Sequence, residues 1–229
     1  GALDIVGYNY TEYKYEEDHK TYPDRVLYGS ETRHDIEAWK AVRDKDFIFG
    51  QFIWTGIDYL GEAGPWPSRG FTSGMIDLAN NIKPRGYFRQ SLWSNKPMIY
   101  IGTYLLRGNE DEVSIDAQDI WNYNNGEKIR VVCYTNTERA DLFLNGKKVG
   151  KTQKYNDETG IVYWDVTYKK GTLKVVGYNE NEVKATTLIK TSYEPNSLQL
   201  IYKQSDLRFK NDVAIIEVNA IDVNGNLSM

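Results

Sequence analysis

The sequence has 229 residues, 41% of them hydrophobic, which is enough for one large folded domain or two ordinary ones and argues against wholesale disorder. Its 32 acidic and 28 basic residues give a formal net charge of -4 without a basic block, which argues against nucleic acid and against an anionic membrane surface as partners. No apolar stretch reaches the roughly 20 residues that a membrane-spanning helix needs.

The first part of the chain, residues 1–97, alternates predicted strands and helices. A β-branched run at 3–10 predicts a strand, and residues 12–23 predict a charged connection with one or two helical turns. Further strands are predicted at 26–30 and 47–54. The run at 47–54 is apolar on both faces, which is typical of a strand in a buried parallel sheet.

The segment between those two strands has the pattern of an amphipathic helix. Asp35 is the expected N-cap residue of this helix. Because parallel strands need a crossover connection, the order strand–helix–strand predicts a parallel unit. A loop rich in glycine and proline follows at 61–70, and a proline in the first turn predicts a short helix at 84–93.

Past residue 97 the pattern changes to short alternating runs, which predict an immunoglobulin-like β-sandwich over residues 98–192. The turn signals at Asn145-Gly146 and at 124–126 predict hairpins. The single cysteine, Cys133, lies in one of the runs and is expected to be a buried thiol. The runs lie at 130–134, 140–144, 147–150, 162–166 and 173–178.

A third segment, residues 193–229, contains two more apolar runs, at 197–202 and 213–223. This segment is too short to close a sandwich, so it predicts the start of a further, truncated β-sandwich domain. We therefore expect both ends of the chain to be cut.

Functional side chains stand at the expected strand ends. Glu31 ends the first strand of the parallel unit, and Trp54 and Asp58 lie near the end of the second. The carboxyl ends of parallel strands are where ligands bind in α/β folds, and a carboxylate beside an aromatic ring suggests a carbohydrate site. Three parallel strands would leave their faces and an edge open, so residues 1–97 predict the C-terminal part of a (β/α)8 TIM barrel.

Four motifs in this region resemble the final barrel strands of glycoside hydrolase family 2. They are Asp-Ile-Val-Gly-Tyr-Asn-Tyr at 4–10, Gly-Ser-Glu at 29–31, the run at 50–62 that contains Trp-Thr-Gly-Ile-Asp-Tyr-Leu-Gly-Glu, and Gln-Ser-Leu-Trp at 90–93. The likeness is greatest to the β-galactosidase branch with extra C-terminal immunoglobulin-like domains, of the Bacteroidetes type. The resemblance implies a retaining mechanism, with one carboxylate as nucleophile and another as acid/base.

The resemblance also implies a role for individual positions. Glu31 matches the nucleophile, and Tyr10 matches the tyrosine that hydrogen-bonds to that nucleophile. Trp54 matches the tryptophan that forms the floor of the sugar pocket, and His34 matches a histidine near the sugar hydroxyls. Asn9, next to Tyr10, is included as a substrate-binding residue.

Two more residues complete the expected site. Asp58 is a candidate substrate contact, and Trp66, on a loop stiffened by prolines, is a candidate platform at the rim of a sugar pocket. Relatives that cleave glucuronides place an Asn-x-Lys pair after this strand, and residues 69–76 lack it, which favours a neutral sugar. His19 and His34 lack the spacing of a zinc site, so we expect no metal and no cofactor.

The acid/base of the family is the glutamate of an Asn-Glu pair after the fourth barrel strand, which we expect upstream of Gly1. The dipeptide also occurs at Asn109-Glu110 and Asn179-Glu180, but both pairs fall in expected turns of the β-rich region and are interpreted as coincidence.

The favoured hypothesis is that the chain is a C-terminal fragment of a retaining exo-β-glycosidase, a β-galactosidase, and is inactive by itself. For the full-length enzyme we expect a β-galactoside substrate, a periplasmic or extracellular location and no membrane insertion. Assembly of the full-length enzyme as a homo-oligomer is left open. Two alternatives remain. One is a carbohydrate-binding module that uses Tyr134, Tyr163 and Trp164, and the other is a structural spacer array.

Overall fold

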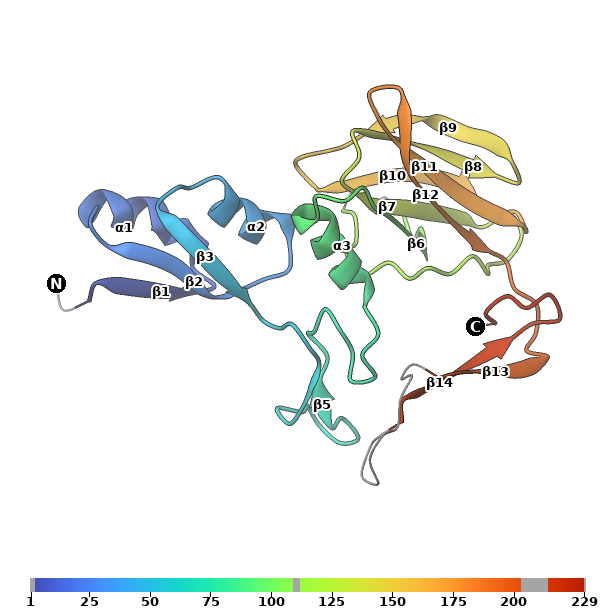
Figure 1. Cartoon of the computed structure of the whole chain (residues 1–229), viewed down its shortest axis with the longest axis horizontal. Coiled ribbons are helices and arrows are strands. Elements are labelled where there is room, and N and C mark those ends of the chain that lie inside the picture. The colour runs from blue at the N-terminus through green and yellow to red at the C-terminus, as the bar shows by residue number, and fades with distance from the viewer. Residues whose placement is uncertain (1–2, 109–111, 203–213, 229) are drawn as a thin grey trace.

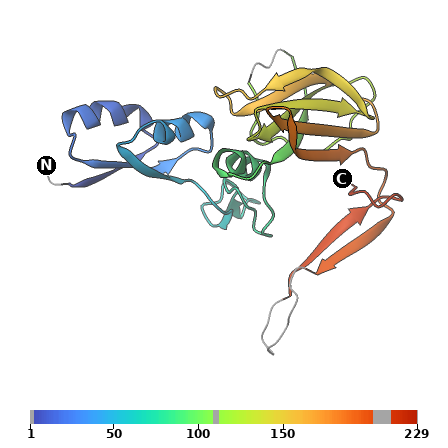
Figure 2. The same ribbon diagram turned by 45° about the horizontal axis from the view of Figure 1, so that its top comes forward.

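The computed structural model describes residues 3–108, 112–202 and 214–228. These residues are mainly β-strands with few helices (Figure 1). Both views show an α/β section at the N-terminal end, a two-sheet sandwich, and a two-stranded ribbon that stands apart from the sandwich (Figures 1 and 2).

The α/β section is built on a parallel three-stranded sheet in the order β1-β2-β3. Its elements in chain order are β1 (Ile5–Asn9), α1 (Tyr15–Thr21), β2 (Val26–Thr32), α2 (Ile36–Arg43) and β3 (Ile48–Ile53). The helices α1 and α2 are the crossover connections, and both lie on the same face of the sheet (Figure 1). The sheet is open, and the described residues form no closed barrel.

Local sequence signals account for the helices. The Asp35 carboxylate accepts a hydrogen bond of 2.8 Å from the Ala38 amide, so Asp35 is the N-cap of α2 as expected. The helix α3 (Pro84–Trp93) begins at the proline that predicted it, because proline has no amide hydrogen to lose in the first turn.

The helical face of the sheet carries a small core of Tyr8, Tyr15, Leu27 and Ile48. The opposite face is bare: Phe49 and Phe52 of β3 are 63% and 62% exposed. The expectation that β3 is buried on both faces is therefore wrong for these residues, since no other element of the described structure covers the second face.

The sandwich consists of two antiparallel sheets, with strand orders β10-β7-β6 and β12-β11-β8-β9. Sequence patterns predicted five of its strands but missed the first and the last, β6 and β12. The strands are β6 (Ile99–Leu105), β7 (Lys128–Thr135), β8 (Arg139–Leu144), β9 (Lys147–Lys154), β10 (Ile161–Thr167), β11 (Thr172–Asn179) and β12 (Glu182–Lys190).

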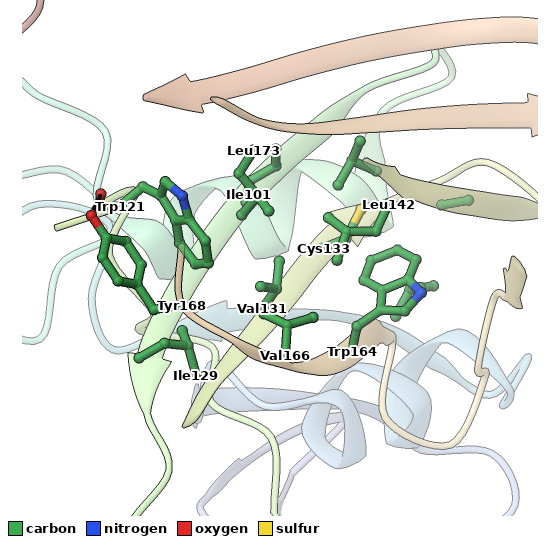
Figure 3. Close-up of a cluster of buried hydrophobic side chains, with 13 residues drawn as sticks. Ile101, Trp121, Ile129, Val131, Cys133, Leu142, Trp164, Val166, Tyr168 and Leu173 are labelled. Atoms are coloured by element: carbon green, nitrogen blue, oxygen red, sulfur yellow. Dashed lines mark hydrogen bonds between the residues drawn. The ribbon is translucent and has the colours of Figure 1, made fainter. Parts of the chain in front are cut away.

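A hydrophobic core fills the space between the two sheets (Figure 3). Trp121 and Trp164 lie at its two ends, and Cys133 lies between them as the buried thiol that was expected. Burial raises the pKa of the Cys133 thiol well above its ordinary range, so it is protonated and inert.

The two expected hairpins differ in outcome. Asn145 and Gly146 join β8 to β9 with φ of +51° and +76°, which confirms that hairpin. Residues 124–126 form a turn but no hairpin, because the preceding strand, β6, ends at Leu105, far from the turn, and β7 begins at Lys128. Trp121, just before this turn, packs into the core.

A second hydrophobic cluster joins the sandwich to the α/β section. Ile36 of α2 and Phe88 of α3 pack with Tyr100, Tyr134 and Ile161 of the sandwich. The ring of Phe88 meets that of Tyr134 edge-on, with centroids 5.6 Å apart. The division at residue 97 falls between α3 and β6, and as a domain boundary it stays a prediction.

The last described strands, β13 (Ser197–Tyr202) and β14 (Ile216–Ile221), form an antiparallel ribbon. Leu198, Leu200 and Val218 on this ribbon are exposed. A two-stranded ribbon with exposed apolar side chains is marginally stable by itself.

Candidate active site

The carboxyl ends of the three parallel strands bring the expected residues together. The Tyr10 amide donates a hydrogen bond of 2.9 Å to the Glu31 carbonyl, and the Trp54 amide donates one of 3.1 Å to the Thr32 carbonyl. Asn9 pairs with Glu31 across β1 and β2, after a shift of register that follows Tyr8. Such a bulge changes the direction of the side chains beyond it.

Tyr10 and Glu31 also interact through their side chains. Partial burial, followed by the neighbouring Glu31 carboxylate, raises the pKa of Tyr10. The guanidinium of Arg33 lies 5.1 Å from the centre of the Tyr10 ring and opposes the shift. Tyr10 is therefore protonated near neutral pH and offers a hydrogen-bond donor to the Glu31 carboxylate beside it.

Trp54 is half-buried at the end of β3, and its peptide bond to Thr55 is cis. The chain after Trp54 folds back in a short hairpin of β4 (Tyr59–Leu60) and β5 (Gly70–Phe71). This hairpin places the Tyr59 ring 5.8 Å from that of Trp54, at an angle of 84°.

Tyr59 and Glu62 join this group, although the sequence analysis assigned them no role. The Tyr59 hydroxyl donates a short hydrogen bond to the Glu62 carboxylate and also hydrogen-bonds to Trp54. Desolvation, followed by the bond to Glu62, raises the pKa of Tyr59 to about 12, and the charge of Glu31 adds to the shift. The available signal was the Tyr59-Leu60-Gly61-Glu62 sequence, in which a glycine lets the chain turn between the tyrosine and the carboxylate.

His34 is buried behind these strand ends. Its Nε2 atom lies 3.2 Å from the carbonyl oxygen of Thr55, so it links the end of β2 to the residue after Trp54. Burial lowers the pKa of His34, which is neutral at pH 7. Its expected contact with sugar hydroxyls stays a prediction.

Asp58 is buried and bound within the protein. Its carboxylate accepts hydrogen bonds from the Gly74 amide at 2.7 Å and from the Lys83 ammonium at 2.9 Å. Lys83 also donates to the Thr72 carbonyl at 2.7 Å, so this pair fastens the loop that follows β3. The geometry assigns Asp58 a bracing role, and its expected contact with substrate stays a prediction.

Asn9 and Trp66 are both exposed. Trp66 projects from its loop with 78% of its surface exposed, and the Arg69 guanidinium lies 5.0 Å from its ring. An exposed aromatic ring on a loop fits the rim position expected for Trp66, and substrate contact by either residue stays a prediction.

The aromatic residues of the sandwich do not form a binding platform. Tyr134 and Trp164 are buried in the two hydrophobic clusters, and Arg130 lies 4.6 Å from the ring of Tyr163. The binding-module alternative therefore loses two of its three side chains.

The two Asn-Glu dipeptides can be placed only in part. Asn179 and Glu180 lie at the β11–β12 turn, as expected, and Asn109-Glu110 lies outside the described residues. In the part of the chain that the structure describes, no helix is long and apolar enough to cross a bilayer. In that same part, no three His, Cys, Asp or Glu side chains are grouped to hold a metal ion.

Comparisons with known proteins identify relatives of this chain. A family model described as a domain of unknown function (DUF4982) matches residues 126–185, within the sandwich. The chain is 34% identical over 195 residues to the β-galactosidase BoGH2A of Bacteroides ovatus, which covers 83% of the chain and 21% of that protein. It is 32% identical over 200 residues to a putative β-glucuronidase of Formosa agariphila, covering 82% of the chain and 18% of that protein.

A solved structure shares the fold almost from end to end. It belongs to a glycosyl hydrolase family 2 member from Bacteroides cellulosilyticus, with a TM-score of 0.85 and 30% identity over 98% of this chain and 32% of that one. A β-glycosidase from Bacteroides vulgatus, at 23% identity and a TM-score of 0.82, shows the same fold. The chain spans about a fifth of the length of these curated relatives.

Proposed function

Because this chain belongs to glycoside hydrolase family 2, we propose that it is the carboxyl-side part of a retaining exo-β-glycosidase that acts on β-galactosides. The observation that carries the proposal is the placement of Tyr10, Glu31 and Trp54 at the carboxyl ends of adjacent parallel strands, with the Tyr10 phenol next to the Glu31 carboxylate. A carboxylate with a fixed donor, next to an aromatic ring that can stack on a sugar, is what a glycosidase needs on one side of its pocket.

Residues 1–97, in this proposal, are the last strands of a (β/α)8 barrel. The bare face of β3, with exposed Phe49 and Phe52, is suited to the packed interior of such a barrel.

The proposed chemistry assigns one bond change to Glu31. Its carboxylate attacks the anomeric carbon and forms a covalent glycosyl-enzyme, while the bond to the aglycone oxygen breaks. A second, protonated carboxyl group, which we place upstream of this chain, gives its proton to that oxygen, and the resulting carboxylate then takes a proton from the water that cleaves the glycosyl-enzyme. Tyr10, beside Glu31, offers the hydrogen-bond donor that holds the Glu31 carboxylate in position.

The sugar is proposed to be neutral. The relatives include proteins named as a β-galactosidase and as β-glucuronidases, so similarity by itself leaves both substrates open. The absence of an Asn-x-Lys pair in residues 69–76 supports a galactoside over a glucuronide.

The test uses the full-length enzyme and an aryl β-galactoside. Glu31→Gln should lower kcat by at least about a thousandfold, because it removes the nucleophile. Tyr10→Phe removes one hydrogen bond to a charged partner, worth about 1.5–3 kcal/mol, so kcat/KM should fall about 10- to 150-fold. NMR of the first product should show the β-anomer, since the mechanism retains configuration.

The 229-residue chain by itself should show no turnover, because the proposed acid/base lies outside it. Turnover of the isolated chain at an enzymatic rate, or an α-anomer as first product of the full-length enzyme, would contradict the proposal.

A further inference from the structure

The loop after β3 carries a second carboxylate that the proposed mechanism does not use. Glu62 lies in a turn in which Gly61 and Glu62 have φ of +92° and +44°. Left-handed backbone is uncommon for a residue other than glycine and persists where surrounding contacts require it. Here the turn brings the Glu62 carboxylate back to the Tyr59 hydroxyl, which donates to it.

Tyr59 ties this carboxylate to the aromatic side chain of the site. Its ring meets Trp54 edge-on at 5.8 Å and Phe71 of β5 at 5.8 Å, so it is held on two sides. Its hydroxyl bonds to Trp54 as well as to Glu62, and it lies within the field of Glu31. Glu62 is therefore connected to the proposed sugar platform through a single side chain.

Positive charges near the site are held elsewhere. The guanidinium of Arg33 lies over the Tyr10 ring at 5.1 Å, and that of Arg69 lies over the Trp66 ring at 5.0 Å. Among the described residues, no ion pair joins either arginine to Glu62. The charge that is connected to Trp54 through Tyr59 is therefore negative.

We propose that Glu62, positioned by Tyr59, is a specificity-determining residue that disfavours sugars carrying a carboxylate and so selects neutral hexosides. The physical basis is repulsion between the Glu62 carboxylate and a carboxylate on a sugar bound at Trp54, which weakens the binding of the charged sugar and not of the neutral one. The inference rests on the proposed function, because it needs a sugar to bind at Trp54.

The experiment measures competitive inhibition of the full-length enzyme by galactose and by galacturonate, which differ only at C6. In the wild type, galacturonate should inhibit more weakly than galactose at low ionic strength. Glu62→Gln should lower the ratio of the inhibition constant of galacturonate to that of galactose about fivefold. A factor of this size is the upper end of the effect that an exposed pair of charges has on binding. Tyr59→Phe keeps the ring but removes the hydroxyl that holds the Glu62 carboxylate. It should therefore lower the same ratio of inhibition constants by a smaller factor.

Salt separates a charge effect from a merely structural one. Raising the ionic strength from 0.01 M to 1 M shortens the screening length from about 30 Å to about 3 Å, so the wild-type ratio should approach that of Glu62→Gln. The ratio in Glu62→Gln should stay constant with salt. Glu158→Gln, which changes an exposed glutamate of the sandwich, is the matched control and should behave as the wild type.

The two proposals fail in different ways. If wild-type enzyme hydrolyses the galactoside and Glu31→Gln abolishes this, but Glu62→Gln leaves the ratio within twofold, the role of Glu62 is overturned and the proposed function stands. If the wild type neither hydrolyses the galactoside nor binds galactose, both are overturned.

Discussion

Two tyrosines at the end of the parallel sheet each lie next to a carboxylate: Tyr10 beside Glu31, and Tyr59, which donates a hydrogen bond to Glu62. The pKa of both phenols is raised, that of Tyr59 to about 12, so both are protonated near neutral pH. Each phenol therefore offers a hydrogen-bond donor to the carboxylate beside it. The pairs flank Trp54, which makes this strand end the most chemically organised part of the described chain.

His34 gives a prediction at the same scale. Its pKa is lowered by burial, so the unfolded chain binds a proton more readily than the folded chain as pH falls below about 6.5. The stability that neutral His34 contributes is thus present above pH 6.5 and is lost as pH falls towards the lower, folded-state pKa. In His34→Gln, the drop in Tm between pH 7.5 and pH 5.5 should be smaller than in the wild type. An equal pH dependence in His34→Gln and the wild type would contradict the assignment.

At the scale of elements, the stability of the parallel unit depends on the residues that start its helices and on the apolar side chains that these helices bury. α2 starts at a side-chain cap and buries Ile36 and Ala38, and α3 starts at a proline. The loop between β3 and α3 has little regular structure and is fastened by the Asp58–Lys83 pair. A strand end can carry a site only if the loop that follows it is held in one conformation, which this pair provides.

Asp35 tests the first of these features. Asp35→Ala removes the hydrogen bond to the Ala38 amide and should lower the free energy of unfolding by about 1 kcal/mol. Urea unfolding measures this change. Asp24→Ala, at an exposed aspartate before β2, should stay within about 0.5 kcal/mol of the wild type, and equal effects of both substitutions would refute the cap.

At the scale of the whole molecule, the sandwich braces the section that carries the site. Ile36 and Phe88, from helices behind β2 and β3, pack into the outer face of the sheet that contains β6 and β7. Asp157 of the sandwich pairs with Lys40 and Arg43 of α2, and Asp116 pairs with Arg85 of α3. The sandwich therefore fixes the positions of α2 and α3 through the shared hydrophobic cluster and these ion pairs, in addition to the contacts of the helices within the α/β section.

Phe88→Ala should lower the stability of the whole chain by about 3–5 kcal/mol, because it leaves a cavity in the shared cluster. Thermal unfolding followed by circular dichroism measures the effect, which should appear as a lower Tm. Leu78→Ala, at an exposed leucine, is the control and should change little. A Tm for Phe88→Ala equal to that of the wild type would mean that the two sections do not share a core.

Much of the local structure follows from sequence alone. Asp35, Pro84 and Asn145-Gly146 mark a helix start, another helix start and a hairpin, and each signal acts within a few residues of itself. The alternating runs predicted five strands of the sandwich, and the strand-end positions of Tyr10, Glu31 and Trp54 placed these residues near one another. These signals predicted the elements correctly because each one reflects a preference of the backbone over a few neighbouring residues.

The remaining features were decided by the tertiary structure. The turn at 124–126 has a hairpin signal, yet it lies at the end of the long connection between β6 and β7. The bare face of β3, the Tyr59–Glu62 bond and the packing of Phe88 on Tyr134 join elements whose spacing along the chain does not specify their contact. Such contacts depend on strand register and on which elements cover which face, and periodicity within one segment carries no information about either.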